Sequence, residues 1–449
     1  KGNFITIHKV GDKIYFEYPL KYFGREVLIA STPSATSNPE MVNVGYKSRT
    51  PLHMKFVKED STVFVMDCTI STSVDDTKEM KEAAKLSYMD VCRYKFKIEA
   101  YNNDSSAVVF EAQKLLTDDK LCPISGSVMG MAISGKNRSD VTSFGKIKSL
   151  DDNVSVEIRE VYHCTAKLMF FTLTLGDIAV NTVKNILLLP EEKMKPRILD
   201  PRIGVFLTDK KNISPKEGAT YYAYANRWRL EPKDVQAWEH GELVEPVKPI
   251  VFYLERTFPE NWKPAIRQGV LDWNMAFEKI GFKNAIQVKD FPENDSTFDP
   301  DNLKYSCIRY CPSSVANAMG PSWVDPTTGE IINASVIIYN DIVKLVSQWR
   351  FVQTAQVDEA VRAKELPQDR LHEALVYVAA HEVGHTLGLM HNMSSSHAYP
   401  VDSLRSATFT HQYGTTPSIM DYARFNYVAQ VGDKGLKLTP PALGLYDYY

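Results

Sequence analysis

The stretch HEVGHTLGLMHN, residues 381–392, holds three histidines and one glutamate at the spacing that a catalytic zinc site requires. Residues four apart lie on one face of an α-helix, so His381 and His385 present two imidazoles to one ion. Glu382 stands about 100° further round the helix and reaches the open side of that ion. Gly388 ends the helix, because glycine takes the left-handed conformation without a Cβ penalty. The chain then turns back and delivers His391 as a third ligand, which leaves one coordination position for water.

This pattern of residues would rarely arise by chance. Ordinary residue frequencies give three histidines, a glutamate and a glycine in fixed register a chance of roughly 10⁻⁵ in a chain of this composition. A structural zinc site is the main alternative, but such sites usually close with four protein ligands and favour cysteine. No cysteine follows Cys311. The pattern therefore indicates a single catalytic Zn²⁺ in a hydrolase.

A second motif, SIMDY at residues 418–422, follows the zinc motif. A lone methionine usually fills a gap in a core, but Met420 stands behind a complete long zinc motif, which resembles the signature of the metzincin clan of zinc proteases. In that clan a methionine turn, the Met-turn, underlies the metal. Tyr422 matches a tyrosine that in some metzincins ligates the resting metal and then hydrogen-bonds the oxyanion. The resemblance implies Glu382 and Tyr422 as catalytic residues and the three histidines as zinc ligands.

Further stretches extend this resemblance through most of the chain from about residue 200 onward. They are DPRIGVF (200–206), RWRLEPK (227–233), VKPIVFYL (247–254), DWNMAFE (272–278) and VDPTTGEII (324–332). They look like landmarks of large, secreted or envelope-associated bacterial zinc-dependent metalloproteases with a long N-terminal domain of unassigned function. The resemblance implies endopeptidase activity on proteins or peptides, in a secreted or cell-envelope (periplasmic or surface) location. It supplies no substrate preference.

Composition restricts the remaining functional classes. The 449 residues are 44% hydrophobic, enough for two or three domains with their own cores. The net charge of −3 and the scattered lysines and arginines argue against nucleic-acid binding. No apolar run of about 18 residues predicts a transmembrane segment, and residues 1–5 lack a signal-peptide core. The resemblance implies that a signal or lipoprotein segment has been removed before Lys1, and the short stretch after the Met-turn predicts that the chain is a fragment truncated at its C-terminus.

The first half of the chain is predicted to be rich in β-structure. Short alternating apolar runs predict strands at residues 13–18, 62–66, 107–110 and 168–173, and helices are predicted at 77–86 and 177–188. The stretch GMAISGK, residues 130–136, matches most of a phosphate-binding loop, but Asn137 replaces the hydroxyl that would bind Mg²⁺, so we expect a flexible turn. A polar stretch with three prolines, residues 231–249, predicts a linker with the boundary near Glu245.

The predicted fold class is α+β with two domains: a β-rich N-terminal domain, residues 1–245, and a metzincin-like zinc-protease domain, residues 246–449. The second domain would hold a twisted mixed sheet, an active-site helix and the Met-turn. Its expected elements are a strand at 250–254, a helix at 263–280, strands at 285–288, 306–310 and 335–339, and a helix opening at Pro367. By resemblance, residues 316–322 are the edge strand along which an extended substrate lies. An ordinary loop and hairpin fits that segment equally well.

Several alternatives stay open at this point. Asp295, Asp299 and Asp301 form an acidic loop that suits either a structural Ca²⁺ or solvent, without an EF-hand pattern. Cys307 and Cys311 fit a local disulfide or, the reading we favour, two reduced thiols. The oligomeric state is not predicted.

The function predicted is a zinc-dependent endopeptidase with Glu382 as general base. The alternative is a catalytically weak or latent surface binding protein, whose N-terminal domain recognises a polymer or occludes the cleft. The intact glutamate argues against an inactive remnant.

Overall fold

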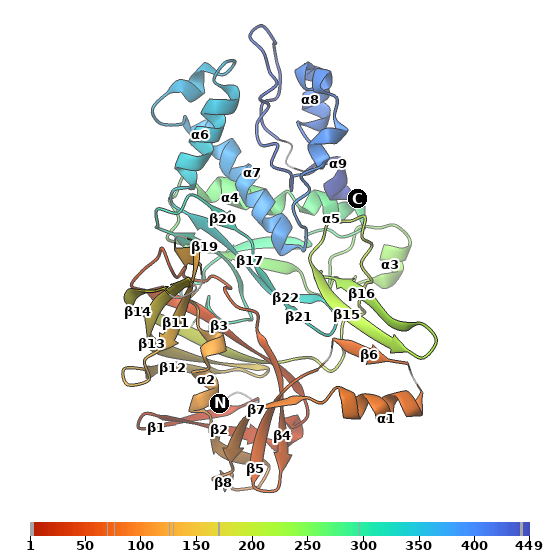
Figure 1. The fold of residues 1–449 in the computed structure, drawn as a ribbon. Coiled ribbons are helices and arrows are strands. Elements are labelled where there is room, and N and C mark those ends of the chain that lie inside the picture. Colours follow the sequence, from red (N-terminus) through yellow and green to blue (C-terminus); the bar gives the residue numbers. More distant parts are fainter. Residues whose placement is uncertain are drawn as a thin grey trace.

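The computed structural model describes residues 4–69, 71–75, 77–124, 126–128, 130–168, 171–295, 297–440 and 443–449. Strands dominate the first half of the chain, and most helices belong to the second half (Figure 1). This division is the α+β architecture predicted from the sequence, with a β-rich N-terminal part and a mixed helix-and-sheet part after it.

Three sheets build the N-terminal part. The largest has the order β10-β11-β13-β14-β3-β4-β5-β7, with β12 paired to β13; a second has the order β1-β2-β9-β8, and a third has the order β16-β15-β6. The strands are β1 (Thr6–Val10), β2 (Lys13–Pro19), β3 (Glu26–Thr36), β4 (Leu52–Glu59), β5 (Thr62–Asp67), β6 (Thr72–Val74), β7 (Val91–Lys97), β8 (Ala100–Tyr101), β9 (Ala107–Glu111), β10 (Ser127–Val128), β11 (Met131–Asn137), β12 (Ser143–Ser149), β13 (Asn153–Leu168), β14 (Phe171–Leu188), β15 (Leu207–Ser214) and β16 (Gly218–Ala225). The helical elements are η1 (Leu20–Tyr22), α1 (Lys78–Ser87), α2 (Gln113–Leu116) and η2 (Asp119–Leu121). Apolar side chains of the first two sheets share one buried core, in which Phe16, Phe56 and Phe110 pack together.

The predicted strands at 13–18, 62–66 and 107–110 and the helix at 77–86 are confirmed by β2, β5, β9 and α1. The helix predicted at 177–188 is wrong, because this segment is the second half of β14, paired on both sides with β13 and β3. Its Ile178 and Val180 are buried while Ala179 between them is exposed, which is the two-residue period of a strand.

Two further predictions in this half are wrong. The strand predicted at 168–173 is wrong as a single strand, because Leu168 ends β13, Phe171 begins β14 and these two residues pair with each other; residues 169 and 170 lie outside the described residues. The flexible turn predicted at 130–136 is mostly strand β11, which pairs with β13. In both places the long β13 strand supplies hydrogen-bond partners that short local patterns do not reveal.

The second part is organised on one mixed sheet with the order β18-β17-β19-β22-β20, with β21 also paired to β22. Strands β17 (Ile250–Leu254), β18 (Ile286–Asp290), β19 (Ser306–Cys311) and β22 (Glu330–Tyr339) run parallel, and β20 (Ala318–Met319) and β21 (Ser322–Asp325) run antiparallel to β22. The helical elements are α3 (Val235–Glu239), α4 (Lys263–Leu271), α5 (Asn274–Lys279), α6 (Ile342–Thr354), η3 (Glu359–Arg362), α7 (Gln368–Thr386), η4 (Ser395–Ala398), η5 (Val401–Arg405), α8 (Ala407–Tyr413) and α9 (Leu445–Tyr448).

This arrangement confirms the predicted strand order. Of residues 316–322, Ala318 and Met319 form the edge strand β20, and Ser322 begins β21, which forms a hairpin with β22, so both readings of this segment are met in part. The single helix predicted at 263–280 is two helices, α4 and α5, separated by Asp272 and Trp273. Helices α4 and α7 share the main core with the sheet and touch closely, because a Cβ on Gly269 would lie 2.6 Å from the carbonyl oxygen of Val376.

The two parts are joined by polar and apolar contacts at β21 and at the segment before β19. Asn153 and Asn302 exchange two buried side-chain hydrogen bonds, and the Trp323 indole donates to the carbonyl oxygen of Arg49 at 2.9 Å. Ala30 and Leu303 pack with Trp323 in a small buried cluster. The N-terminal part therefore lies against the sheet that carries the edge strand, while the domain boundary near Glu245 stays a prediction.

Candidate metal centre

Helix α7 places the first two histidines. It begins after Pro367 as predicted and ends at Thr386. Gly388 then adopts φ +108°, and a Cβ there would lie 2.3 Å from the carbonyl oxygen of Asn226. Both the left-handed backbone and the close approach require glycine. The chain turns back, and the amide of Met390 donates to the carbonyl oxygen of Gly204, which fixes the segment that carries His391.

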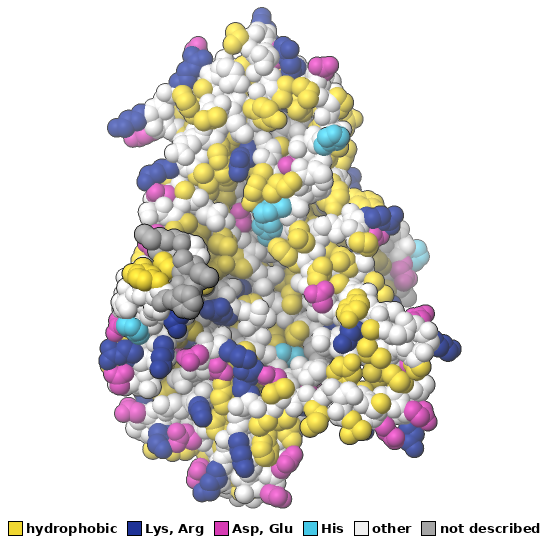
Figure 2. All heavy atoms as spheres, viewed as in Figure 1, with side chains coloured by type: hydrophobic (Ala, Val, Ile, Leu, Met, Phe, Trp, Pro, Cys, Tyr) yellow, Lys and Arg dark blue, Asp and Glu magenta, His cyan; other side chains and the backbone are white. Residues whose placement is uncertain are grey.

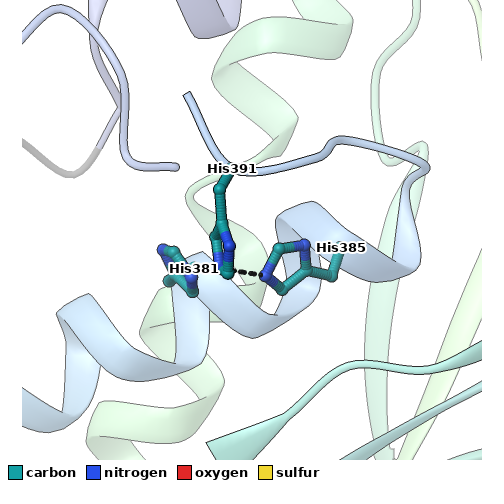
Figure 3. Close-up of side chains that lie close together, drawn as sticks. All are labelled: His381, His385 and His391. Carbon is teal, nitrogen blue, oxygen red and sulfur yellow. Dashed lines mark hydrogen bonds between the residues drawn. The ribbon is translucent and has the colours of Figure 1, made fainter. Parts of the chain in front are cut away.

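The three histidine side chains converge, His381 and His385 from α7 and His391 from the returning segment (Figure 3). One nitrogen from each lies within 4.8 Å of the others, and the Nε2 atoms of His385 and His391 are 3.1 Å apart. Two nitrogens on one tetrahedral zinc, each about 2.0–2.1 Å from the ion, stand about 3.4 Å apart. Among the described residues, this is the sole group of three His, Cys, Asp or Glu side chains with such spacing.

Backbone carbonyls orient two of these rings. The Nδ1 of His381 donates to Ile419 O and that of His385 to Leu389 O, each at 2.8 Å. A proton on Nδ1 leaves the lone pair on Nε2, so both rings are held in the tautomer that binds a metal. Burial lowers the pKa of His381 to about 3 and also lowers the pKa values of His385 and His391. The imidazoles are therefore neutral near pH 7, which is the form of a metal ligand.

The segment 418–422 lies directly behind the histidines. Met420 is buried, and a Cβ on Gly384 of α7 would stand 2.3 Å from its Sδ. The carbonyl of Met420 accepts from the amide of Asn392, next to His391. The Ile419 carbonyl accepts a hydrogen bond from the His381 ring, and the Met420 carbonyl holds the backbone next to His391. The turn therefore supports the histidine cluster.

The sequence comparisons agree with this geometry, since the family described as Met-zincin matches residues 363–449. Residues 363–449 are a Met-zincin domain. Two families, each described as a domain of unknown function, match residues 45–233 and 3–36. Searches of curated proteins and of solved structures find no match. The family and the three-histidine cluster together support a zinc metalloprotease.

Glu382 lies next to His381 in the lining of one pocket, and its carboxyl group is almost fully buried. Burial raises the pKa of Glu382 to about 8, since a charged carboxylate loses its hydration there. A cation at the histidine cluster would oppose this shift. Without a cation the carboxyl therefore keeps its own proton near pH 7, and a cation would favour the carboxylate, which is the form that accepts a proton as a general base.

Tyr422 stands beside the histidine cluster. Its ring centroid is 4.5 Å from that of His391 and 5.5 Å from that of His381, and the residue is 43% exposed. Partial burial, together with the nearby Glu382, raises the pKa of the Tyr422 hydroxyl, which stays a neutral donor at pH 7. Its catalytic role stays a prediction.

Two hollows adjoin the histidines. A pocket of about 260 Å³ lies beside Glu382, lined by Asn317, Ala318, Ile342, Leu345, Trp349, Tyr377, Val378, His381, Glu382, Tyr422 and Arg424. A groove of about 740 Å³ runs between the two parts of the chain, lined on one side by Leu28, His53 and Cys68 and on the other by Phe206 and Trp323. Figure 2 shows histidine side chains at the surface near the centre of this face, above a hollowed region.

Sequence reasoning missed three functional neighbours. Arg424 and Trp349 line the pocket, and Asp447 of α9 accepts hydrogen bonds from Ile419 N and Ser418 Oγ, both at 2.7 Å, which anchors the turn under the metal site. Arg424 is two residues beyond Tyr422, so its proximity to the site was readable from the sequence. Trp349 and Asp447 are distant in sequence and carry no local signal.

The possible calcium site gains no support in the described part of the chain. Asp301 pairs with Arg309 at 2.9 Å, and Asp295 accepts from the amide of Thr297. Cys307 and Cys311 are both buried free thiols, as expected. No helix among the described residues has the length and apolarity needed to cross a membrane.

Proposed function

We propose that this protein is a zinc-dependent endopeptidase in which His381, His385 and His391 hold Zn²⁺ and Glu382 is the general base. The observation that carries the proposal is the convergence of three neutral imidazoles beside one buried carboxyl group within a Met-zincin domain. When bound, Zn²⁺ supplies Lewis acidity that acidifies water and polarises a peptide carbonyl.

The protein's own groups move the proton. Glu382, in its carboxylate form, accepts a proton from the attacking water and returns it to the amine that leaves. Tyr422, at the rim, donates a hydrogen bond to the oxygen that becomes negative. These roles assign one residue to proton transfer and one to charge stabilisation.

The substrate is a protein or peptide in extended conformation. Strand β20 ends the sheet and offers its free backbone edge for strand addition. Gly320, next to β20, lies against the carbonyl of Glu382 and also lines the groove, so the groove begins at the catalytic residues. Because Leu28, His53 and Cys68 line its other side, the N-terminal part forms one wall of the substrate cleft.

A latent enzyme, with the N-terminal part covering the site, is less well supported. His391 is exposed and Tyr422 is 43% exposed, so no described segment covers the metal-binding face. We further propose a secreted or cell-envelope location in a bacterium, on the strength of the family resemblance alone.

The test compares two substitutions. Glu382→Gln should retain zinc and lose roughly 10²-fold or more in peptide hydrolysis, the scale of general acid–base catalysis. His385→Ala should lose zinc and activity together. Glu359→Gln, a control at a side chain that is 88% exposed, should behave as wild type. The proposal fails if the zinc-loaded wild-type chain cleaves no member of a peptide library, or if Glu382→Gln cleaves as fast as wild type.

A further inference from the structure

The pocket beside Glu382 has apolar walls and one cation. Ile342, Leu345 and Trp349 of α6 and Val378 of α7 line it together with Arg424. Glu382 is the only acidic residue among the lining residues. A small, mostly apolar pocket whose single cation has no carboxylate partner favours a ligand that has an apolar stem and a negative charge at its end.

Arg424 has no ionic partner among the described residues, and its Nε is buried without a hydrogen-bond acceptor. Arg424 as a whole is half-buried. The two fully buried arginines of this part of the chain are paired: Arg309 with Asp301, and Arg350 with Asp358 and Glu373. Leaving a buried N–H donor of a charged group, such as Arg424 Nε, without an acceptor costs free energy. An arginine that is kept unpaired in a pocket is therefore available for a ligand carboxylate.

The guanidinium of Arg424 is also held in position. Its central carbon lies 3.9 Å from the centroid of the Trp349 ring and 5.0 Å from that of Tyr422. Stacking on aromatic rings leaves the edge of the planar guanidinium free to bind a carboxylate through two parallel hydrogen bonds. The backbone of Arg424 adopts φ +54°, a conformation that costs an ordinary residue free energy and marks functional sites.

Neighbouring carboxylates do not neutralise this cation. Asp421, three residues before Arg424, accepts hydrogen bonds from the amide of Ser396 and from the hydroxyl of Thr416. No described ion pair joins Glu382 to Arg424, and burial alone shifts the pKa of Glu382. The charge of Arg424 is thus left for the substrate.

The position of Glu382 indicates which substrate residue enters the pocket. Glu382 returns its proton to the leaving amine, which belongs to the residue that follows the scissile bond. The pocket shares Glu382 as a wall, so the side chain of that same residue is the nearest one able to enter. We propose that this pocket selects aspartate or glutamate immediately after the scissile bond, with Arg424 as the specificity-determining residue. This inference rests on the proposed endopeptidase function.

The first experiment is cleavage of a peptide library by the zinc-loaded full chain, with cleavage sites read by mass spectrometry. Aspartate and glutamate should be enriched at the residue after the cut. In matched peptides, glutamate should exceed glutamine there by at least about 10-fold in kcat/KM, the lower end expected of a hydrogen bond between charged groups. Cleavage with no acidic enrichment, or with enrichment only before the cut, overturns this inference but leaves the proposed function standing. No cleavage at all overturns both.

The second experiment changes the charge at position 424 by replacing Arg424 with asparagine or aspartate, two residues that tolerate a positive φ. Arg424→Asn should abolish the preference for glutamate over glutamine, and Arg424→Asp should reverse it in favour of lysine. Arg362→Gln, at an exposed arginine on η3, should keep the wild-type preference. Zinc content and melting temperature monitor folding of each variant. A preference for acidic residues that survives in well-folded Arg424→Asn contradicts the role of Arg424.

A binding measurement provides a readout without turnover. Zinc-loaded Glu382→Gln should bind the glutamate peptide about 10-fold more tightly than the glutamine peptide, by fluorescence anisotropy. The difference should disappear in Glu382→Gln combined with Arg424→Asn. Equal affinities for the two peptides in Glu382→Gln would show that the pocket does not recognise the carboxylate.

Discussion

Gly384→Ala reverses the usual effect of replacing a glycine inside a helix. Alanine normally stabilises an exposed helix interior by about 1 kcal/mol relative to glycine. At this position the added Cβ would lie 2.3 Å from Met420 Sδ and 3.0 Å from Trp273 Cζ2, far inside the distance of van der Waals contact. Overpacking a filled core costs about 1–3 kcal/mol, and a contact this short puts the cost at the upper end. We expect a net loss of about 2 kcal/mol in the free energy of unfolding.

The assay is urea unfolding of the metal-free chain, followed by zinc titration. Zinc affinity should also fall, because moving Met420 displaces the Ile419 carbonyl that orients His381 at 2.8 Å. A double-mutant cycle provides the control: in a Met420→Ala background the sulfur is absent and only the 3.0 Å approach to Trp273 remains, so Gly384→Ala should destabilise the chain much less than in wild type. If Gly384→Ala is as stable as wild type, or if the two substitutions are additive, the close packing of the helix on the Met-turn is refuted.

Two further predictions concern other parts of the molecule. Tyr422→Phe should lower kcat with little change in KM or zinc content, the pattern for an interaction made mainly in the transition state; steady-state kinetics measure it, and an unchanged kcat would remove Tyr422 from the mechanism. Glu26 has its pKa lowered to about 2 by His53 Nε2 at 3.4 Å and Lys193 Nζ at 3.0 Å, against the effect of burial. Its stabilising contribution is complete above its ordinary pKa of about 4.5 and is lost as the pH falls toward 2. Melting temperatures of Glu26→Gln should therefore depend less on pH than wild type between about pH 4.5 and 2, and identical slopes would contradict this assignment.

The local part of the metal site was predictable from the sequence alone. The spacing of His381 and His385 sets two ligands on one helical face, and Gly388 determines where that face ends. The strands and helix order after residue 250 were also predictable, because long, strongly periodic segments follow local patterns. These features depend on residues within a few positions of one another, so the local sequence is enough to predict them.

Tertiary structure decided the features that join distant segments. Residues 177–188 form a strand because β13 and β3 supply hydrogen bonds on both sides, which overrides the local pattern. Ile419 orients His381 and Asp447 anchors the turn beneath it, across 38 and 28 residues of chain. The unpaired state of Arg424 is visible only once the packing shows that no described carboxylate reaches it. Burial, ring orientation and the absence of a partner depend on residues that are close in space but distant in sequence. Local sequence patterns therefore do not specify them.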